Sequence, residues 1–173
     1  MSEALKILIL TGAPGVGKTT VSKVWVMAHK GVAVPGDSFT DWLYNSRIER
    51  FSTEEEALVA NLAVATAVQY LKTGMGVVLD YVWRANGLEI IKNRLEAELS
   101  SVQQKFVHLI CGLEENHRRD QLRISDHQML NRVDMVNLEL SQEKWPQHVE
   151  EIDSTSLSVS ETVAQIENTF STK

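Results

Sequence analysis

The chain has 173 residues, of which 43% are hydrophobic and 23% are charged, and these values are ordinary for a globular protein. We therefore expect one domain over residues 1–173, long enough to bury a single core. The formal net charge of −6 argues against partners that need a basic face, so we expect no binding to nucleic acid and none to an anionic membrane.

The first predicted element is a strand over Lys6–Leu10, a short apolar run suited to a parallel sheet that is covered on both faces. The next segment, Gly12–Thr20, reads Gly-Ala-Pro-Gly-Val-Gly-Lys-Thr-Thr and fills the phosphate-binding pattern G-x-x-x-x-G-K-T. Apolar residues at helical spacing then predict a helix over Thr20–His29. In this order of strand, loop and helix, the helix N-terminus adds partial positive charge at the phosphates. A glycine turn that binds nothing is the alternative.

The residue types in the loop predict nucleotide binding with Mg²⁺. Glycines let backbone N–H groups turn toward the phosphates, and Lys18 is expected to neutralise the β and γ oxygens. The hydroxyl of Thr19 is expected to ligate Mg²⁺. The residues expected to contact the nucleotide are Gly12, Ala13, Pro14, Gly15, Val16, Gly17, Lys18, Thr19 and Thr20.

Further along the chain, Gly31–Pro35 predicts a second strand, and its proline favours an edge position. Ser52-Thr53-Glu54-Glu55 forms a capping box that opens a helix reaching Gly74. The apolar spacing of that helix predicts an inner face made of Leu58, Leu62, Ala65, Val68 and Leu71. A third buried strand is expected over Gly76–Asp80, and a helix over Ala85–Leu99 with Ile90, Ile91 and Leu95 facing inward.

The last third of the chain predicts strands over Phe106–Cys111 and Val149–Ile152 and a closing helix over Glu161–Phe170. Between Leu113 and Trp145 there is neither proline nor glycine, so this segment is expected to be helical, with a hinge that the pattern does not locate. Strands that alternate with helices call for an α/β fold with a parallel sheet. The only cysteine is Cys111, so no internal disulfide can form. The sequence also has no basic-plus-apolar leader and no long apolar stretch. Together these three features lead us to expect a cytoplasmic protein.

Two aspartates follow predicted strands. Asp80 closes the third strand, a position from which a carboxylate can reach the Mg²⁺ shell beside a phosphate loop, although it could also cap the next turn. Asp37 follows the second strand at the sheet edge where ligands of open α/β folds collect, and it is expected to hold or deprotonate an acceptor hydroxyl. Asp37-Ser38 as a helix cap is the alternative.

Two absences favour phosphoryl transfer over hydrolysis. The residue after Asp80 is Tyr81, whereas motor ATPases often carry a glutamate there to polarise a water molecule. The chain also lacks the D-x-x-G and N-K-x-D elements expected of a GTPase.

Four arginines, Arg118, Arg119, Arg123 and Arg132, lie in the segment after the fourth strand. They are expected to belong to a lid over about residues 114–132 that closes on the γ-phosphate and stabilises transition-state charge. Arg119 and Arg123 are four residues apart and share a helix face, whereas Arg118 points elsewhere, so the first two are the expected catalytic arginines. A solvated face paired with Glu114, Glu115, Asp120 and Asp126 is the alternative.

Aromatic and basic residues beside the two aspartates could line an acceptor pocket or be ordinary packing: Trp42, Tyr44, Arg47, Trp83 and Arg84. The five histidines show no metal-ligand spacing and are interpreted as surface residues: His29, His108, His117, His127 and His148.

With the loop, Asp37, Asp80 and the arginines in place, nearly the whole chain resembles the small P-loop kinases of the gluconate kinase, shikimate kinase and chloramphenicol phosphotransferase group. The resemblance implies a three-layer fold with five parallel strands in the order 2-3-1-4-5 and a helical lid. It also implies ATP as the nucleotide, Asp37 as the acceptor-binding residue, and the stretch Ile152–Ser158 beside the adenine.

The chain departs from individual members of that group. Gluconate kinases carry a histidine-phenylalanine-methionine stretch where this chain reads Asp126-His127-Gln128-Met129, and the glycine triplet of shikimate kinases is missing. The expected function is therefore transfer of the γ-phosphoryl group of ATP to a hydroxyl of a small molecule by a monomer or homodimer. A nucleoside or nucleoside-monophosphate kinase and an ATP-binding switch with little turnover are the alternatives.

Overall fold

The computed structural model describes residues 5–44, 46–99, 101–125 and 128–171. Its centre is a sheet of five parallel strands, which lie in the order β2 (Val32–Pro35), β3 (Val77–Asp80), β1 (Lys6–Thr11), β4 (Gln103–Ile110) and β5 (Val149–Asp153). This confirms the predicted order, with β2 at an edge. The register pairs Leu10 with Asp80, so the phosphate loop after β1 and the carboxylate at the end of β3 leave the same edge of the sheet.

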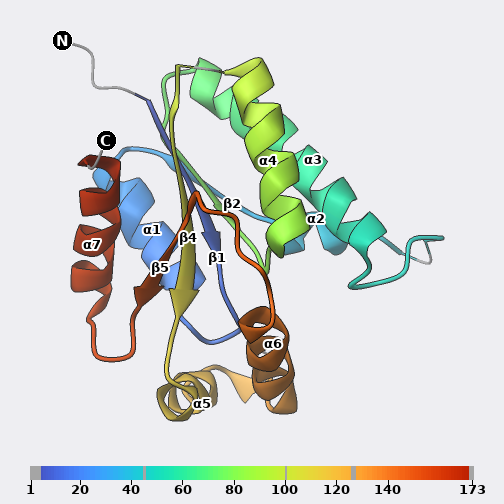
Figure 1. Cartoon of the computed structure of the whole chain (residues 1–173), viewed down its shortest axis with the longest axis vertical. Helices are drawn as coiled ribbons and strands as arrows, with labels where there is room; N and C mark the ends of the chain where they lie inside the picture. The colour runs from blue at the N-terminus through green and yellow to red at the C-terminus, as the bar shows by residue number, and fades with distance from the viewer. Residues whose placement is uncertain (1–4, 45, 100, 126–127, 172–173) are drawn as a thin grey trace.

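Helices cover both faces of the sheet, which confirms the three-layer α/β fold (Figure 1). On one face, α3 (Thr53–Lys72) and α4 (Ala85–Glu98) pack against each other and against the sheet. On the other face lie α1 (Lys18–Ala28) and α7 (Val159–Ser171), with Trp25 and Ile166 fully buried between helix and strand. The two faces use alternate residues of β1, Ile7 and Ile9 on the first and Leu8 and Leu10 on the second.

The predicted inner face of α3 was partly wrong. The helix begins as expected, because the hydroxyl of its N-cap Ser52 accepts a hydrogen bond from the Glu55 backbone N–H at 3.1 Å. Leu62 and Ala65, however, lie on its exposed side. The buried surface is alanine-rich and packs against α4 and the sheet, because small side chains let the helix approach its neighbours closely. The buried residues are Val59, Ala60, Ala63, Val64, Ala67, Val68 and Leu71.

The segment predicted as helical over Leu113–Trp145 forms two helices, α5 (Leu113–Gln121) and α6 (Asn131–Ser141), beyond the carboxyl edge of the sheet (Figure 1). Residues 122–130 connect them, and the predicted Asp126 and His127 lie outside the described residues. The other corrections are small: β4 begins at Gln103, and α7 begins at Val159. A short helix, α2 (Asp37–Thr40), follows β2.

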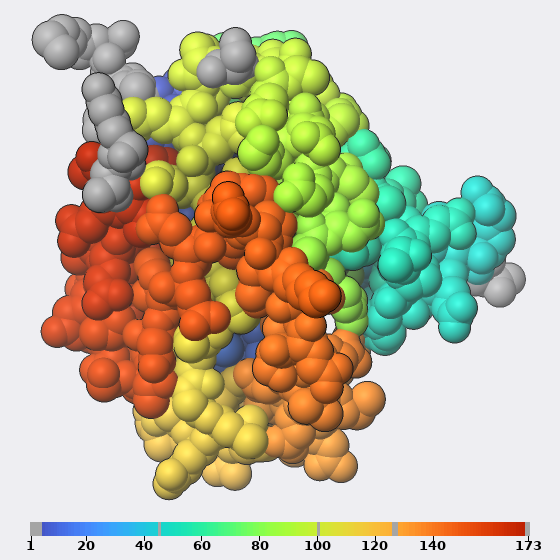
Figure 2. Space-filling model, in the orientation of Figure 1, coloured from blue at the N-terminus to red at the C-terminus, as the bar shows by residue number. Residues whose placement is uncertain are grey.

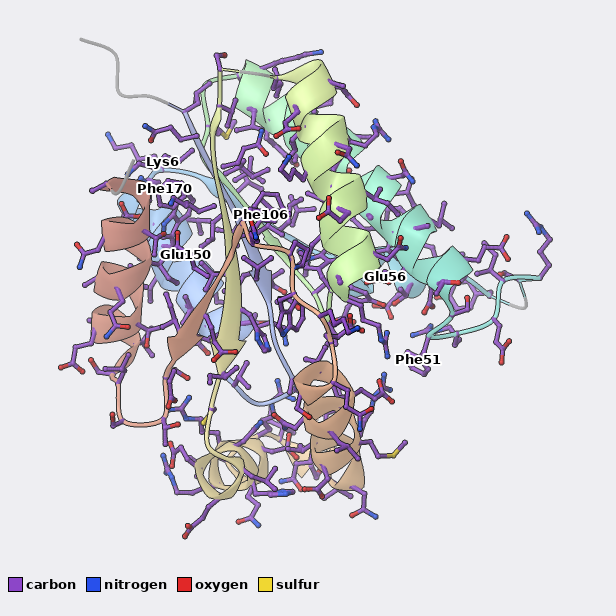
Figure 3. The ribbon with its side chains drawn as sticks, viewed as in Figure 1. Lys6, Phe51, Glu56, Phe106, Glu150 and Phe170 are labelled. Carbon is purple, nitrogen blue, oxygen red and sulfur yellow. The ribbon has the colours of Figure 1, made fainter. Side chains whose placement is uncertain are left out.

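Side chains of α7 contact Lys6 and His29 at the end of the sheet that lies opposite the phosphate loop. Lys6 and Phe170 lie beside each other there (Figure 3), with the Lys6 ammonium 5.1 Å from the ring centroid. The carboxylate of Glu167 accepts hydrogen bonds from Lys6 and pairs with the His29 ring, each at 2.8 Å. His29 therefore has a structural partner.

Nothing in the described part of the chain forms a helix with the length and hydropathy needed to span a bilayer.

Replacing Ser52 with Ala is expected to lower the free energy of unfolding by about 1 kcal/mol, because the helix loses the side-chain oxygen that satisfies its N-terminal N–H. Urea unfolding monitored by circular dichroism measures the change. Ser38→Ala, at an exposed position of α2, is the matched control and should stay within about 0.5 kcal/mol. Equal changes in the two variants would contradict the capping role.

Candidate functional site

The phosphate loop owes its backbone to three glycines. Gly12, Gly15 and Gly17 have φ angles of 148°, 86° and 104°, a region that residues with side chains rarely adopt. Gly17 is the N-cap of α1 and Lys18 is its first residue, so the loop leads directly into the N-terminal end of the helix. The N–H groups of such a turn and the helix dipole favour the binding of an anion at this position.

A residue that the sequence analysis did not single out, Asn116 of α5, packs against this loop. A Cβ atom on Gly15 would lie 2.3 Å from the Asn116 Oδ1 atom, so the glycine is required for space as well as for its backbone angle. Asn116 is fully buried, and neither polar atom of its amide has a hydrogen-bond partner. Helix α5 thus rests directly on the phosphate loop.

Lys18 reaches back over the loop. Its ammonium donates to the backbone carbonyls of Gly12 at 2.7 Å and Ala13 at 3.1 Å, which holds the charge where phosphate oxygens would bind. Burial lowers the pKa of Lys18 to about 8, and the negative charges of Asp80 and Asp37 only partly oppose this effect. The lysine is therefore close to losing its proton at neutral pH when no anion is bound.

Asp80 lies at the carboxyl end of β3 and is almost fully buried. Burial raises the pKa of Asp80 above its usual range, and the nearby Lys18 ammonium and Ser22 hydroxyl lower it again in part. A buried carboxylate beside a lysine, with the exposed Thr19 on the first turn of α1, has the donor chemistry that Mg²⁺ takes from proteins when phosphates supply further ligands. The described residues contain no cluster of three or more histidine, cysteine or carboxylate side chains that could hold a metal alone.

Arg119 fastens α5 to two loops. Its guanidinium donates to the Val16 carbonyl at 3.2 Å and to the Ser154 carbonyl at 2.7 Å, and it also pairs with Glu115. Ser154 lies in the stretch Ile152–Ser158, which the resemblance places beside the adenine. In this structure Arg119 therefore joins the phosphate loop, α5 and the turn after β5.

Arg123 and Arg118 take different positions. Arg123 lines the same cavity as Arg119 and lies 3.5 Å from the Asp120 carboxylate, whereas Arg118 is exposed and paired with Glu115. Asp120 is itself buried, and its Oδ2 atom accepts hydrogen bonds from the backbone of Met129 and Leu130. The carboxylates thus pair with the arginines, as in the alternative interpretation, while Arg119 and Arg123 still face the phosphate loop.

A cavity of about 270 Å³ lies where these groups meet. The face seen in Figure 2 also has a hollow between the yellow and orange segments, in which N-terminal residues are visible in blue. The residues present fit a nucleotide with Mg²⁺: cations and glycine N–H groups for the phosphates and apolar side chains beyond them. The cavity is lined by Gly15, Gly17, Lys18, Thr19, Thr20, Arg119, Leu122, Arg123 and Val159.

Asp37 is the first residue of α2 and is exposed, and the N-cap of this helix is Gly36. The structure therefore contradicts the alternative in which Asp37 caps the helix. The negative charge of Asp37 contributes to the pKa of Lys18, of Asp80 and of Tyr81, so its carboxylate lies within electrostatic reach of these three side chains.

A second cavity, of about 320 Å³, has Asp37 among its lining residues. It lies between the start of α3, the segment after β3, and α6. Its walls are mostly apolar, with charged groups at two ends. It is lined by Asp37, Phe51, Ser52, Glu55, Glu56, Tyr81, Val82, Arg84, Arg132, Met135, Val136 and Glu139.

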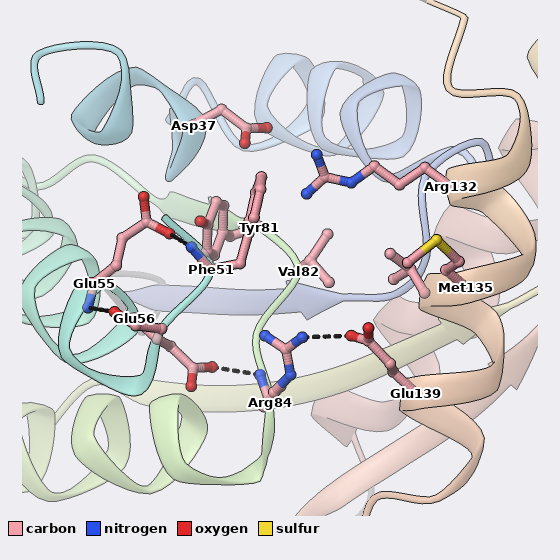
Figure 4. A pocket seen from close by; sticks show the side chains of 12 residues that line it. Asp37, Phe51, Glu55, Glu56, Tyr81, Val82, Arg84, Arg132, Met135 and Glu139 are labelled. Atoms are coloured by element: carbon pink, nitrogen blue, oxygen red, sulfur yellow. Dashed lines mark hydrogen bonds and ion pairs between the residues drawn. The ribbon is translucent and has the colours of Figure 1, made fainter. Parts of the chain in front are cut away.

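Figure 4 shows how these side chains divide the cavity. Asp37 and Arg132 lie at one end, and the Arg132 guanidinium stacks on the Phe51 ring, 3.9 Å from its centroid. At the other end Arg84 pairs with Glu139, and the Arg84 backbone N–H donates to Glu56. Figure 3 places Phe51 and Glu56 near the N-terminal end of α3.

Several residues suggested by the sequence do not reach this cavity. Trp42 and Tyr44 are exposed, Arg47 pairs with Glu54 at the surface, and Trp83 is fully buried in the core. Of that group only Arg84 lines the cavity. His108 is buried, and His29 and His148 are partly buried, which corrects their interpretation as surface residues; burial lowers the pKa of His108 and of His148.

No protein-family model matches the sequence, and a comparison with curated proteins also finds no match. Solved structures do resemble it. The APS kinase CysC of Mycobacterium tuberculosis, in complex with AMPPNP and APS, has a TM-score of 0.71 at 15% identity over 98% of this chain and 99% of that one. A sugar kinase from a Janibacter species has a TM-score of 0.70 at 12% identity over 95% and 93%. A gluconokinase from Sinorhizobium meliloti has a TM-score of 0.63 at 15% identity over 96% and 91%. The fold of the chain is that of the small P-loop kinases.

Replacing Gly15 with Ala is expected to weaken ATP binding at least tenfold, because the methyl group meets Asn116 and the backbone angle becomes strained. Isothermal titration with ATP and Mg²⁺ measures the affinity. The double variant Gly15→Ala, Asn116→Ala removes the steric clash and should recover part of the loss. Unchanged affinity in the single variant would show that α5 does not constrain the loop.

The affinity for ATP is expected to fall above pH 8. Bound phosphates favour the charged form of Lys18, so binding is unaffected below the pKa of about 8 in the free protein. Above that pH a proton must be taken up on binding, and affinity drops by up to about tenfold per pH unit until the higher pKa of the complex is reached. Titrations between pH 7 and 9 measure this, and Lys18→Ala should bind weakly with a flat profile. A steep decline retained in Lys18→Ala would assign the titration to another group.

Proposed function

We propose that the chain is a kinase that transfers the γ-phosphoryl group of ATP, with Mg²⁺, to a hydroxyl group of a small molecule. The observation that carries the proposal is that Asp37 lines the second cavity and lies within electrostatic reach of the phosphate loop. Its charge acts on Lys18 and Asp80 at the nucleotide side, and its side chain lines the second cavity. A carboxylate placed there can hold the acceptor hydroxyl beside the phosphates.

In the proposed reaction the acceptor oxygen attacks the γ-phosphorus as the bond from that phosphorus to the β–γ bridging oxygen breaks. The hydroxyl proton passes to the Asp37 carboxylate, and ADP leaves with the bond electrons on its terminal phosphate oxygen. Lys18 holds the phosphate oxygens, and Arg123 faces them across the nucleotide cavity. Thr19 and Asp80 would hold Mg²⁺, which supplies charge neutralisation to the phosphates.

The contacts of Arg119 assign it a positioning role within this proposal. Its donors already serve the carbonyls of Val16 and Ser154, so it orients the phosphate loop and the turn beside the adenine. Arg123 is then the arginine proposed to stabilise charge in the transition state.

Two alternative functions make different demands on the site. A nucleoside-monophosphate kinase needs arginines for the acceptor phosphate, but Arg47 is at the surface and Arg84 is paired with Glu139. A nucleotide-dependent switch does not need a carboxylate beside the phosphates or a second cavity. The arrangement around Asp37 therefore favours transfer to a neutral hydroxyl.

Asp37→Asn is expected to reduce acceptor-dependent ADP formation at least 100-fold and to leave ATP affinity within about threefold, because the amide cannot accept the proton. A coupled assay across sugar acids, nucleosides, aryl alcohols and hydroxylated antibiotics measures transfer. Asp41→Asn, on the adjacent turn, is the matched control and should retain activity. Full transfer by Asp37→Asn would remove that residue from the mechanism, and a slow, acceptor-independent release by both proteins would favour the switch.

A further inference from the structure

The charged side chains of the second cavity disfavour a negatively charged ligand. Four carboxylates line it, against two guanidinium groups. Arg50 lies behind Glu55 and pairs with it at 2.9 Å, and Arg84 pairs with Glu139. The charges left facing the cavity are then Asp37 and Glu56 against Arg132. Burial raises the pKa of the Glu56 carboxyl, which favours its neutral, protonated form. Even in that form, the charges of Asp37 and Arg132 cancel, and the cavity has no net positive charge to attract an anion.

Arg132 is not an isolated positive charge in this cavity, because Asp37 also lines it. Its guanidinium stacks on Phe51, and Figure 4 shows it directed toward Asp37. An acceptor with a carboxylate or phosphate near Arg132 would bring a second negative charge toward Asp37, and the two would repel each other. At the other end, an anion would have to displace Glu139 from Arg84.

The middle of the cavity is apolar. Phe51 and Met135 are half or more exposed over it, with Tyr81, Val82 and Val136 behind them. A sugar acid or other polyol keeps its water and gains little against such walls, whereas a flat ring removes apolar surface from water on both sides. The volume of about 320 Å³ is at the lower end for ligand pockets, which suits a compact molecule.

We infer that the acceptor is a compact, ring-bearing alcohol that carries no negative charge. Its hydroxyl lies at the Asp37 end, its ring lies between Phe51, Val82 and Met135, and a polar group can meet Arg84 and Glu139. The inference rests on the proposed function for the identity of the reacting hydroxyl, whereas the preference for a neutral or cationic ring follows from the cavity alone.

The test is binding of a matched series to the whole protein with ADP and Mg²⁺ present. The series is 1-phenyl-1,2-ethanediol, its 4-aminomethyl and 4-carboxy derivatives, and glycerol as the diol without a ring. Nucleosides are avoided because they can also enter the nucleotide cavity. Ligand-observed NMR titration measures each dissociation constant. The neutral and cationic aryl diols are expected to bind at least tenfold more tightly than the carboxy derivative and than glycerol.

Two variants locate the effect. Glu139→Gln frees Arg84 and should reduce the discrimination against the carboxy derivative at least fivefold, while Asp134→Asn, on the same helix but outside the cavity, should not change it. Met135→Gln should weaken the binding of the neutral aryl diol at least threefold. Met27 is exposed on α1, and Met27→Gln should leave that dissociation constant unchanged. Both methionines are exposed, so these changes leave the core intact.

The outcomes separate this inference from the proposed function. Equal or tighter binding of the carboxy derivative, or no preference for the ring over glycerol, would overturn the inference, even if sugar acids then proved to be phosphorylated. The expected binding order without ADP formation from any bound alcohol, with Asp37→Asn behaving as the parent, would support the cavity assignment and reject the kinase.

Discussion

The conformation of the phosphate loop is the constraint on which the rest of the site depends. Three glycines at positive φ turn its backbone, and the Lys18 ammonium is held over the loop by the carbonyls of Gly12 and Ala13. The loop is also supported from outside, because Asn116 fills the space beside Gly15 and Arg119 binds the Val16 carbonyl. An anion site built in this way is pre-organised, since its donors are positioned before the ligand arrives.

The fold and the position of the glycine-rich loop between β1 and α1 could be predicted because their signals are local. The strands show as short apolar runs, and the glycine pattern can be read within nine residues. Where the pattern was degenerate the prediction was less accurate: alanines did not reveal which face of α3 is buried, and the break between α5 and α6 contains no glycine or proline to mark it. The strand order came from resemblance, because spacing does not determine which strands are neighbours.

The acceptor side could not be predicted from the sequence, because it is assembled from distant segments. Phe51 precedes α3, Tyr81 follows β3, and Arg132 lies in α6, so only the fold brings them together. The aromatic residues that the sequence suggested for this pocket beside Asp37, Trp42 and Tyr44, are exposed to solvent. Arg132 was expected in a lid over the γ-phosphate, but it lines the second cavity instead, because sequence alone does not show that α6 turns to face α3.

Within the proposed function, Tyr81 offers a physical reason for the site to favour an alcohol over water. It occupies the position after Asp80, where a glutamate could polarise a water molecule. Burial and the nearby carboxylates Glu55 and Asp37 raise the pKa of Tyr81 far above its usual range, so the phenol stays protonated and cannot act as a base. Its ring instead belongs to the apolar wall, together with Val82 and Phe51. A water molecule finds little to hold it against that wall, whereas an alcohol attached to a ring is placed with its hydroxyl at Asp37. In this proposal Tyr81 thus has two effects: its protonated phenol cannot serve as a base for hydrolysis, and its ring is part of the apolar surface that can recognise an acceptor.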